Sequence, residues 1–235
     1  NSWEALGLGY IGGDVKQELG DSVELNFFQG CFDSDETILK GTATSDIVAF
    51  SCTSPTYPHT VQLARKIKEQ NPKTWIVVGG YHPSAVPNDC GILGVIDQVI
   101  VGEGEQVLVD IIKGDRSPII TSKYKLEFDQ LAWPDRKLIK NERNVKVAFD
   151  DTGANITSFQ SHRSCPFRCK YCLDGHNKVL YPEIDINTKA PVRYRDVDDL
   201  LDEIEFAVDE YKLDLIKFSD PTWNTSIKWV IDFCE

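Results

Sequence analysis

The chain has 235 residues, a formal net charge of −12 and a pI near 4.8. Hydrophobic residues make up 41% and charged residues 26%, and no apolar run reaches the length of about eighteen residues that a spanning helix needs. The composition therefore excludes membrane-spanning and disordered chains. The acidic charge argues against a nucleic-acid or membrane-surface partner, because a phosphate-rich ligand needs a basic face. A small-molecule ligand is favoured.

Cysteine and methionine usage is unusual, with seven cysteines and no methionine. An odd number of cysteines in a chain without a signal peptide favours a reducing, cytoplasmic location in which thiols act as ligands. The absence of methionine indicates a fragment, or a sequence from which modified methionines are missing.

Residues 1–121 alternate strand and helix patterns after a glycine-rich opening. The predicted strands are 23–28, 46–52, 74–78 and 95–101, and the predicted helices are 58–70 and 103–113. The run 46–52 is apolar almost throughout, as is typical of a strand that is buried on both faces. Strands separated by helices indicate right-handed βαβ units, so we predict a doubly wound parallel sheet of the Rossmann-like α/β class.

Residues 122–150 contain Trp133-Pro134 and show little hydrophobic periodicity, which predicts an irregular connector. The pattern restarts over 151–235. There we predict a strand at Ile156–Gln160, a helix at Asp196–Tyr211 capped by Asp196, a strand at Leu213–Ser219 and a helix from Asn224. Two βα units cannot close a barrel, so we expect the protein to continue beyond Glu235.

Three cysteines are clustered in the segment Ser164-Cys-Pro-Phe-Arg-Cys-Lys-Tyr-Cys172, with the spacing Cys165-x3-Cys169-x2-Cys172. Three thiolates this close in sequence can reach one metal centre. Structural zinc sites need four protein ligands, whereas three thiolates suit a [4Fe-4S] cluster with one open iron. The alternatives are a zinc site completed by His162 or His176, and thiols that bind no metal.

This motif, placed directly after a strand, resembles the signature of radical S-adenosylmethionine (SAM) enzymes. The resemblance implies that Cys165, Cys169 and Cys172 hold a [4Fe-4S] cluster, and that SAM chelates the fourth iron. It also implies that Tyr171 lies against the adenine of SAM, although a packing role in the loop is the alternative. Ser219 and Asp220 are further SAM candidates, but the Gly-Gly-Glu sequence of the family is missing there, and Asp220 could instead cap the last helix.

The first half resembles the cobalamin-binding domain that precedes many radical SAM cores. The likeness lies in the segments 46–54, 77–84 and 101–105, which follow successive strands and so meet at the carboxyl edge of the sheet, where doubly wound folds bind ligands. The candidate cobalamin contacts are Ser51, Thr53, Ser54, Gly79, Gly80, Tyr81, His82, Gly102, Glu103, Gly104 and Glu105. Taken singly, Gly79-Gly80 could be an ordinary turn and 102–105 an ordinary helix start.

One departure concerns the ligand below the cobalt. The Asp-x-His-x-x-Gly motif of other cobalamin domains is absent, because the loop 29–35 contains no histidine. We therefore expect cobalamin to bind without a histidine ligand. His59 and His82 are the nearby alternatives, and for each we expect an ordinary solvated or hydrogen-bonded role, with His59 at the start of a helix.

The resemblance implies a complete domain plan and an activity. Residues 1–121 would be the cobalamin-binding domain, 122–150 the connector, and 151–235 the first part of a radical SAM (β/α)6 partial barrel. The implied activity is radical SAM methyltransfer from methylcobalamin to an unactivated carbon of a small-molecule substrate, with electrons from a reductant such as flavodoxin or ferredoxin. A cyclisation or rearrangement is the alternative, and a non-enzymatic cobalamin or metal-binding module is a third.

A tRNA-modifying radical SAM enzyme is disfavoured. Such an enzyme would need further cluster cysteines and a basic face, whereas Cys31, Cys52 and Cys90 are scattered and the chain is acidic.

Overall fold

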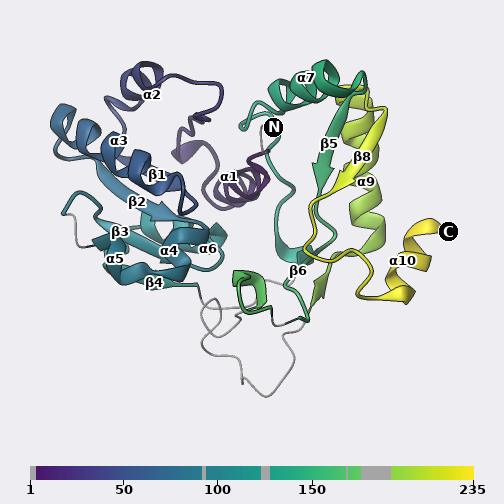
Figure 1. Ribbon diagram of the computed structural model, residues 1–235. Coiled ribbons are helices and arrows are strands. Elements are labelled where there is room, and N and C mark those ends of the chain that lie inside the picture. Colours follow the sequence, from purple (N-terminus) through teal and green to yellow (C-terminus); the bar gives the residue numbers. More distant parts are fainter. Residues whose placement is uncertain (1–3, 92–93, 123–127, 168, 176–191) are drawn as a thin grey trace.

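The computed structural model describes residues 4–91, 94–122, 128–167, 169–175 and 192–235. Figure 1 shows two halves, one built on the strands β1 to β4 and the other on β5 and β8, with helix α1 between them. The first half contains α1 (Leu6–Leu19), η1 (Gly20–Ser22), α2 (Asp35–Thr42), β1 (Ile47–Ser51), α3 (Tyr57–Gln70), β2 (Trp75–Gly79), α4 (Tyr81–Ala85), α5 (Pro87–Gly91), β3 (Gln98–Val101), α6 (Glu105–Ile112) and β4 (Ile119–Thr121).

The first half confirms the predicted parallel sheet. Its strands follow the order β1-β2-β3-β4, and all neighbours are parallel. Helix α3 covers one face, where Val61, Ala64 and Ile67 pack with apolar residues of the strands. Helix α6 covers the other face through Val107 and Ile111. Helices on both faces define a doubly wound α/β fold.

Two sequence predictions in this half are wrong. Residues 23–28 form no strand, and Phe28 instead packs against Gly41, where an added Cβ would lie 2.2 Å from the phenyl ring. Strand β1 is not buried on both faces, because Ala49 and Ser51 are exposed and line a cavity. The apolar run correctly indicated a strand, but one side of that strand faces a site.

The glycine-rich opening, for which we predicted no helix, forms α1. Its glycines allow the connector to approach the helix closely: a Cβ at Gly12 would lie 2.4 Å from Leu138 Cδ2, and one at Gly13 would lie 2.3 Å from the carbonyl oxygen of Trp133. The amide of Asp135 also donates to the carbonyl of Gly9 at 2.9 Å. The glycines, which disfavour a helix in isolation, thus serve its packing.

The second half and the connector contain η2 (Phe128–Gln130), α7 (Asn141–Thr152), β5 (Ile156–Phe159), β6 (His162–Arg163), η3 (Leu173–Gly175), β7 (Arg193–Tyr194), α9 (Val197–Tyr211), β8 (Leu215–Phe218) and α10 (Ile227–Cys234). Strands β5 and β8 are parallel, and β6 and β7 form a short antiparallel pair. The prediction of an irregular connector is wrong over α7. That helix is held to β5 by the side chain of Asn141, which donates to Thr157 Oγ1 at 2.8 Å.

Helix α9 confirms its predicted cap. The carboxylate of Asp196 accepts hydrogen bonds from the amides of Asp198 and Asp199, which are otherwise unpaired at a helix start. Helix α10 begins at Ile227 instead of Asn224, because the side chain of Ser226 supplies its cap. No helix in the described ranges is both long and apolar enough to cross a membrane.

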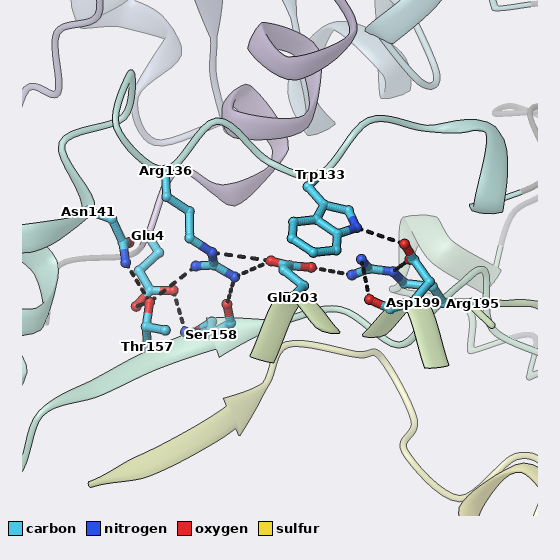
Figure 2. Close-up of polar contacts among 9 residues, drawn as sticks. All are labelled: Glu4, Trp133, Arg136, Asn141, Thr157, Ser158, Arg195, Asp199 and Glu203. Atoms are coloured by element: carbon cyan, nitrogen blue, oxygen red, sulfur yellow. Dashed lines mark hydrogen bonds and ion pairs between the residues drawn. The ribbon is translucent and has the colours of Figure 1, made fainter. Parts of the chain in front are cut away.

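A buried ion network, which we call the Glu203 network, fastens the connector to the second half (Figure 2). It consists of Arg136, Glu203 and Arg195, whose side chains are only 2–3% exposed. Arg136 donates to Glu203 Oε1 at 2.6 Å and to the carbonyl of Ser158 at 3.0 Å, and Arg195 donates to the other carboxylate oxygen of Glu203. The network ties β5, α9 and the connector into one unit.

Candidate functional site

A cavity of about 310 Å³ lies between the two halves. The first half lines it with α1 and with the ends of β1, β2 and β3. The second half contributes the chain just after β5, the segment before Cys165, and the chain just after β8, through residues that include Gln160, Ser164 and Pro221. Parallel strands of both halves therefore present their carboxyl ends to the same space, where open α/β folds bind ligands.

The end of β1 contributes Ser51 to the cavity, whereas Thr53 and Ser54 are not among its lining residues in the described part of the chain. The amide of Thr53 donates to Thr56 Oγ1 at 2.9 Å. Ser54 Oγ lies 3.0 Å from His82 Nδ1. These two predicted contacts therefore shape the turn that leads into α3.

The end of β2 contributes Gly79, Gly80 and Tyr81. Gly80 has φ 95°, and an added Cβ would lie 2.9 Å from the carbonyl oxygen of Cys52, so the backbone here accommodates only glycine. The small side chains leave the strand end open to a bulky ligand.

The two histidines near this edge have protein partners. The ring of His82 packs on Tyr57 with a centroid distance of 4.2 Å, and His82 is not among the lining residues within the described ranges. His59 lies inside α3, with Nε2 2.8 Å from Asp35 Oδ1. That neither histidine binds cobalt stays a prediction, and the buried Nε2 of His82 has no hydrogen-bond partner among the described residues.

The end of β3 contributes the segment Gly102–Glu105, and all four residues line the cavity. Its backbone is held from both sides: the amide of Gly102 donates to Ser84 Oγ at 3.0 Å, and that of Glu103 donates to Ser122 Oγ at 3.1 Å. Gly102 has φ 86°, a conformation that glycine adopts without strain. The segment is therefore a firmly held wall of the site.

Glu103 and Glu105, predicted as cobalamin contacts, form ion pairs with the second half. Arg163 Nη2 lies 2.6 Å from Glu105 Oε1, and Arg163 Nη1 lies 3.4 Å from Glu103 Oε2. Arg193, which is paired with Arg163 in register between β6 and β7, also donates to Glu103. We call these four residues the Arg163 cluster.

The carboxylates of the Arg163 cluster stabilise the charge of the buried Arg163 guanidinium. Burial by itself would lower the pKa of the Arg163 guanidinium, but Glu105 and Glu103 together raise that pKa above its ordinary value. The guanidinium carbon also lies 5.3 Å from the ring centroid of Tyr10 and 5.1 Å from that of Phe128. No local pattern in the sequence predicts this cluster, although two acids lie in one motif and an arginine lies next to the other.

The cysteine loop begins directly after Arg163 and Ser164. All seven cysteines of the chain are described, and none forms a disulfide. Cys165 is buried with its sulfur 3.5 Å from Thr222 Oγ1, Cys172 is half-buried, and Cys169 is exposed. Among the described residues, no three His, Cys, Asp or Glu side chains are close enough together to hold a metal ion. The donor set suits a cluster chemically, but the three sulfurs are not gathered around one point.

The other candidate residues for this loop are His162, His176 and Tyr171. His176, proposed as a fourth zinc ligand, lies outside the described residues. His162 is fully buried, and its Nδ1 lies 3.3 Å from Asp220 Oδ1. Tyr171 is 93% exposed and is not a lining residue of the cavity in the described ranges.

The two SAM candidates after β8 differ in their surroundings. Ser219 lines the cavity, and its amide donates to the carbonyl of Phe159 at 2.8 Å. The carboxylate of Asp220 accepts hydrogen bonds from the amides of Ser161 and His162 at 2.9 and 3.0 Å, so it fixes the turn between β5 and β6. Its predicted alternative as the cap of α10 is wrong.

Similarity to known proteins extends over most of the chain. Residues 1–112 match the family model described as the B12 binding domain. An uncharacterized methyltransferase of Pyrococcus horikoshii is 24% identical over an alignment of 245 positions, which covers 97% of this chain and 50% of that protein. The anaerobic magnesium-protoporphyrin IX monomethyl ester cyclase of Rubrivivax gelatinosus is 24% identical over 217 residues, covering 83% of this chain and 37% of the cyclase. The chain thus spans half or less of these curated relatives.

Two solved structures are similar in fold and cover nearly all of this chain. The radical SAM methyltransferase TsrM of Kitasatospora setae, solved with cobalamin and a [4Fe-4S] cluster, has a TM-score of 0.68 at 14% identity, covering 99% of this chain and 47% of TsrM. The cobalamin-dependent SAM radical enzyme OxsB has a TM-score of 0.70 at 18% identity, covering 97% of this chain and 34% of OxsB.

These matches confirm the resemblance and the fold class that the sequence predicted. Residues 1–112 match the B12 binding domain family, and the fold of the chain is similar to that of the solved structures of TsrM and OxsB.

Proposed function

We propose that the full-length protein is a cobalamin-dependent radical SAM enzyme that methylates an unactivated carbon of a small molecule. One observation carries this proposal: a single cavity is lined both by the three strand ends of the B12-binding half and by the segment that leads into the cysteine motif. Two cofactors that must act on one carbon need a shared space of this kind.

In this proposal each set of residues has one task. Cys165, Cys169 and Cys172 would hold a [4Fe-4S] cluster, and Ser219 would contact SAM. The strand ends around Ser51, Gly80 and Gly102 would hold cobalamin against exposed backbone. The chemistry supplied by the bound cofactors would be one-electron cleavage of SAM and delivery of a methyl group.

The chain's own contribution is placement and shielding. Ala49, Phe50 and Ile100 give the cavity an apolar wall. A volume of about 310 Å³ is at the lower end for small-molecule sites and is too small for a whole cobalamin, so the glycine-lined edge, and not the volume, supports the cofactor assignment.

The partners in this proposal are a small-molecule substrate and a reductant. A cluster that cleaves SAM must receive electrons, and a flavodoxin or ferredoxin is the class of protein that supplies them at low potential.

A second candidate function is a cobalamin-dependent cyclisation. It is favoured by the relatives described as magnesium-protoporphyrin IX monomethyl ester cyclases, one of which aligns with 83% of this chain. The two functions share the cobalamin and cluster residues and differ in what becomes of the substrate.

Mass spectrometry tests the proposal and separates these functions. The full-length protein would be reconstituted without oxygen, then given a reductant, SAM, methylcobalamin and candidate substrates. Methylation predicts a product heavier by one CH₂ unit together with 5′-deoxyadenosine. A cyclised product without this mass gain would support the second function. Cobalamin binding with no cleavage of SAM under any condition would indicate a binding module.

Replacing one candidate cluster ligand gives the first specific prediction. We expect Cys169→Ala to abolish formation of 5′-deoxyadenosine, while cobalamin stays bound because Cys169 does not line the cavity among the described residues. The visible absorbance of the protein measures both cofactors. The matched control is Cys31→Ala, which also removes an exposed thiol, but outside the motif. Cleavage of SAM by the Cys169→Ala variant would contradict the cluster assignment.

A further inference from the structure

The Arg163 cluster connects the two candidate cofactor loops directly. Glu103 and Glu105 belong to the segment that ends β3 in the B12-binding half, and Arg163 stands two residues before Cys165. Three of the four members line the cavity.

The cluster is built as a rigid joint. The side chains of Arg163 and Glu105 are 10% and 5% exposed, so water does little to weaken their attraction. Arg163 contacts both acids, and the rings of Tyr10 and Phe128 pack against its guanidinium from α1 and η2. A planar guanidinium held by two carboxylates and two rings has one orientation, which a lysine could not reproduce.

We propose that Arg163 is a positioning residue that sets the placement of the cysteine loop relative to the Gly102–Glu105 segment. In this role Glu103 and Glu105 act through Arg163 and are not themselves contacts of cobalamin. The functional meaning of this placement rests on the function proposed above, since the two loops would then carry the two cofactors. The coupling between the loops is a property of the chain and can be measured without any cofactor.

Hydrogen exchange of the full-length, cofactor-free protein tests the coupling. In Arg163→Met we expect amide exchange to rise by about tenfold or more in both segments, 98–106 and 160–167, because removing one partner of a buried ion pair leaves the other charge uncompensated. The matched control is Arg143→Met, which removes an ion pair between distant segments, at 2.9 Å from Asp33, away from the cavity. It should leave both segments unchanged.

A merely local role for Arg163 predicts a different pattern. In that case exchange would rise at 160–167 alone, and the proposal would be overturned. If Arg163→Met fails to fold, Arg163→Lys and Glu105→Gln provide milder changes, and each should raise exchange on the opposite side of the joint as well as on its own. The double variant should add little to either single change, because both remove the same interaction.

The loaded enzyme gives a second, independent measurement. We expect Arg163→Lys to bind cobalamin and cleave SAM, but to raise the ratio of 5′-deoxyadenosine to methylated product by about tenfold, since misplaced reactants lose productive transfer first. Equal loss of both products would show a general structural defect and contradict the proposal. A wild-type protein that neither binds cobalamin nor cleaves SAM would overturn the proposed function, while the exchange pattern would still decide the coupling.

Discussion

Two buried arginine–glutamate groups in the described part of the chain have the same chemistry and different positions. The Glu203 network joins the connector to β5 and α9, and none of its members lines the cavity among the described residues (Figure 2). The Arg163 cluster joins the two halves, and most of its members face the cavity. A buried ion pair therefore does not by itself indicate a functional site. Its position decides whether the rigidity that it provides stabilises the fold or holds residues of the candidate site in place.

The physical reason lies in the energy of burial. Removing two charges from water costs about as much as their attraction returns, so a buried pair adds little net stability but strongly penalises every arrangement that separates it. In the Glu203 network this penalty fixes the connector on the second half. In the Arg163 cluster the same penalty fixes two candidate cofactor loops.

The largest effect on stability is expected at Arg136. Arg136→Met leaves Glu203 with one cationic partner and removes donors to Ser158 and Thr157, so we expect the free energy of unfolding to fall by about 3–5 kcal/mol. Urea denaturation measures the loss. Arg143→Met, at a partly exposed pair, should cost about 1 kcal/mol or less.

Either of two results would contradict the difference in role between the Glu203 network and the Arg163 cluster. If Arg136→Met lowered the free energy of unfolding by less than Arg143→Met does, the Glu203 network would not hold the connector. A raised ratio of 5′-deoxyadenosine to methylated product in a folded Arg136→Met protein would show that both ion groups position the site.

An intermediate effect is expected at Asp14, a buried carboxylate for which the described part of the chain shows no ion pair. Burial raises the pKa of Asp14 to about 6, although the amide of Ala132 donates to it and lowers the pKa. Because this pKa lies above the ordinary value of 3.8, the folded protein binds the extra proton, and the contribution of Asp14 to stability falls as pH rises between the two values.

The variant Asp14→Asn removes this titration. We expect its free energy of unfolding, relative to the wild type, to increase by about 2–3 kcal/mol from about pH 4 to about pH 7. Denaturation at a series of pH values measures the difference. If the difference in the free energy of unfolding between Asp14→Asn and the wild type did not change with pH, Asp14 would not be a buried, unpaired carboxylate. Asp14 would then no longer differ from the carboxylates of the two ion groups.

The smallest effects are expected from two glycines of α1. Gly13→Ala places a methyl group against the carbonyl of Trp133 and should lower the free energy of unfolding by about 1–2 kcal/mol. Gly7→Ala meets nothing within 4 Å and should raise it by about 0.5–1 kcal/mol through helix propensity. Thermal unfolding of both variants measures these changes. Equal shifts of the unfolding temperature in the two variants would contradict close packing of the connector on α1.

The sequence was most informative where hydrophobic periodicity and local chemistry agree. The strands β1, β2 and β3, the helices α3 and α9, and the cap at Asp196 were all predicted within a few residues. It failed where packing overrides propensity. Four glycines in α1 concealed a helix, and two phenylalanines near residue 28 suggested a strand that the sheet does not contain.

The candidate site divides in the same way. By itself the sequence determined which residues belong to short motifs, because spacing along the chain is sufficient to recognise the cysteine loop and the strand-end glycines. Only the tertiary structure decided that Glu103 and Glu105 pair with Arg163 and that Asp220 holds a turn. These are contacts between residues about sixty positions apart, and which of many possible charge partners meet across that distance is decided by the packing of the two halves and not by any local pattern.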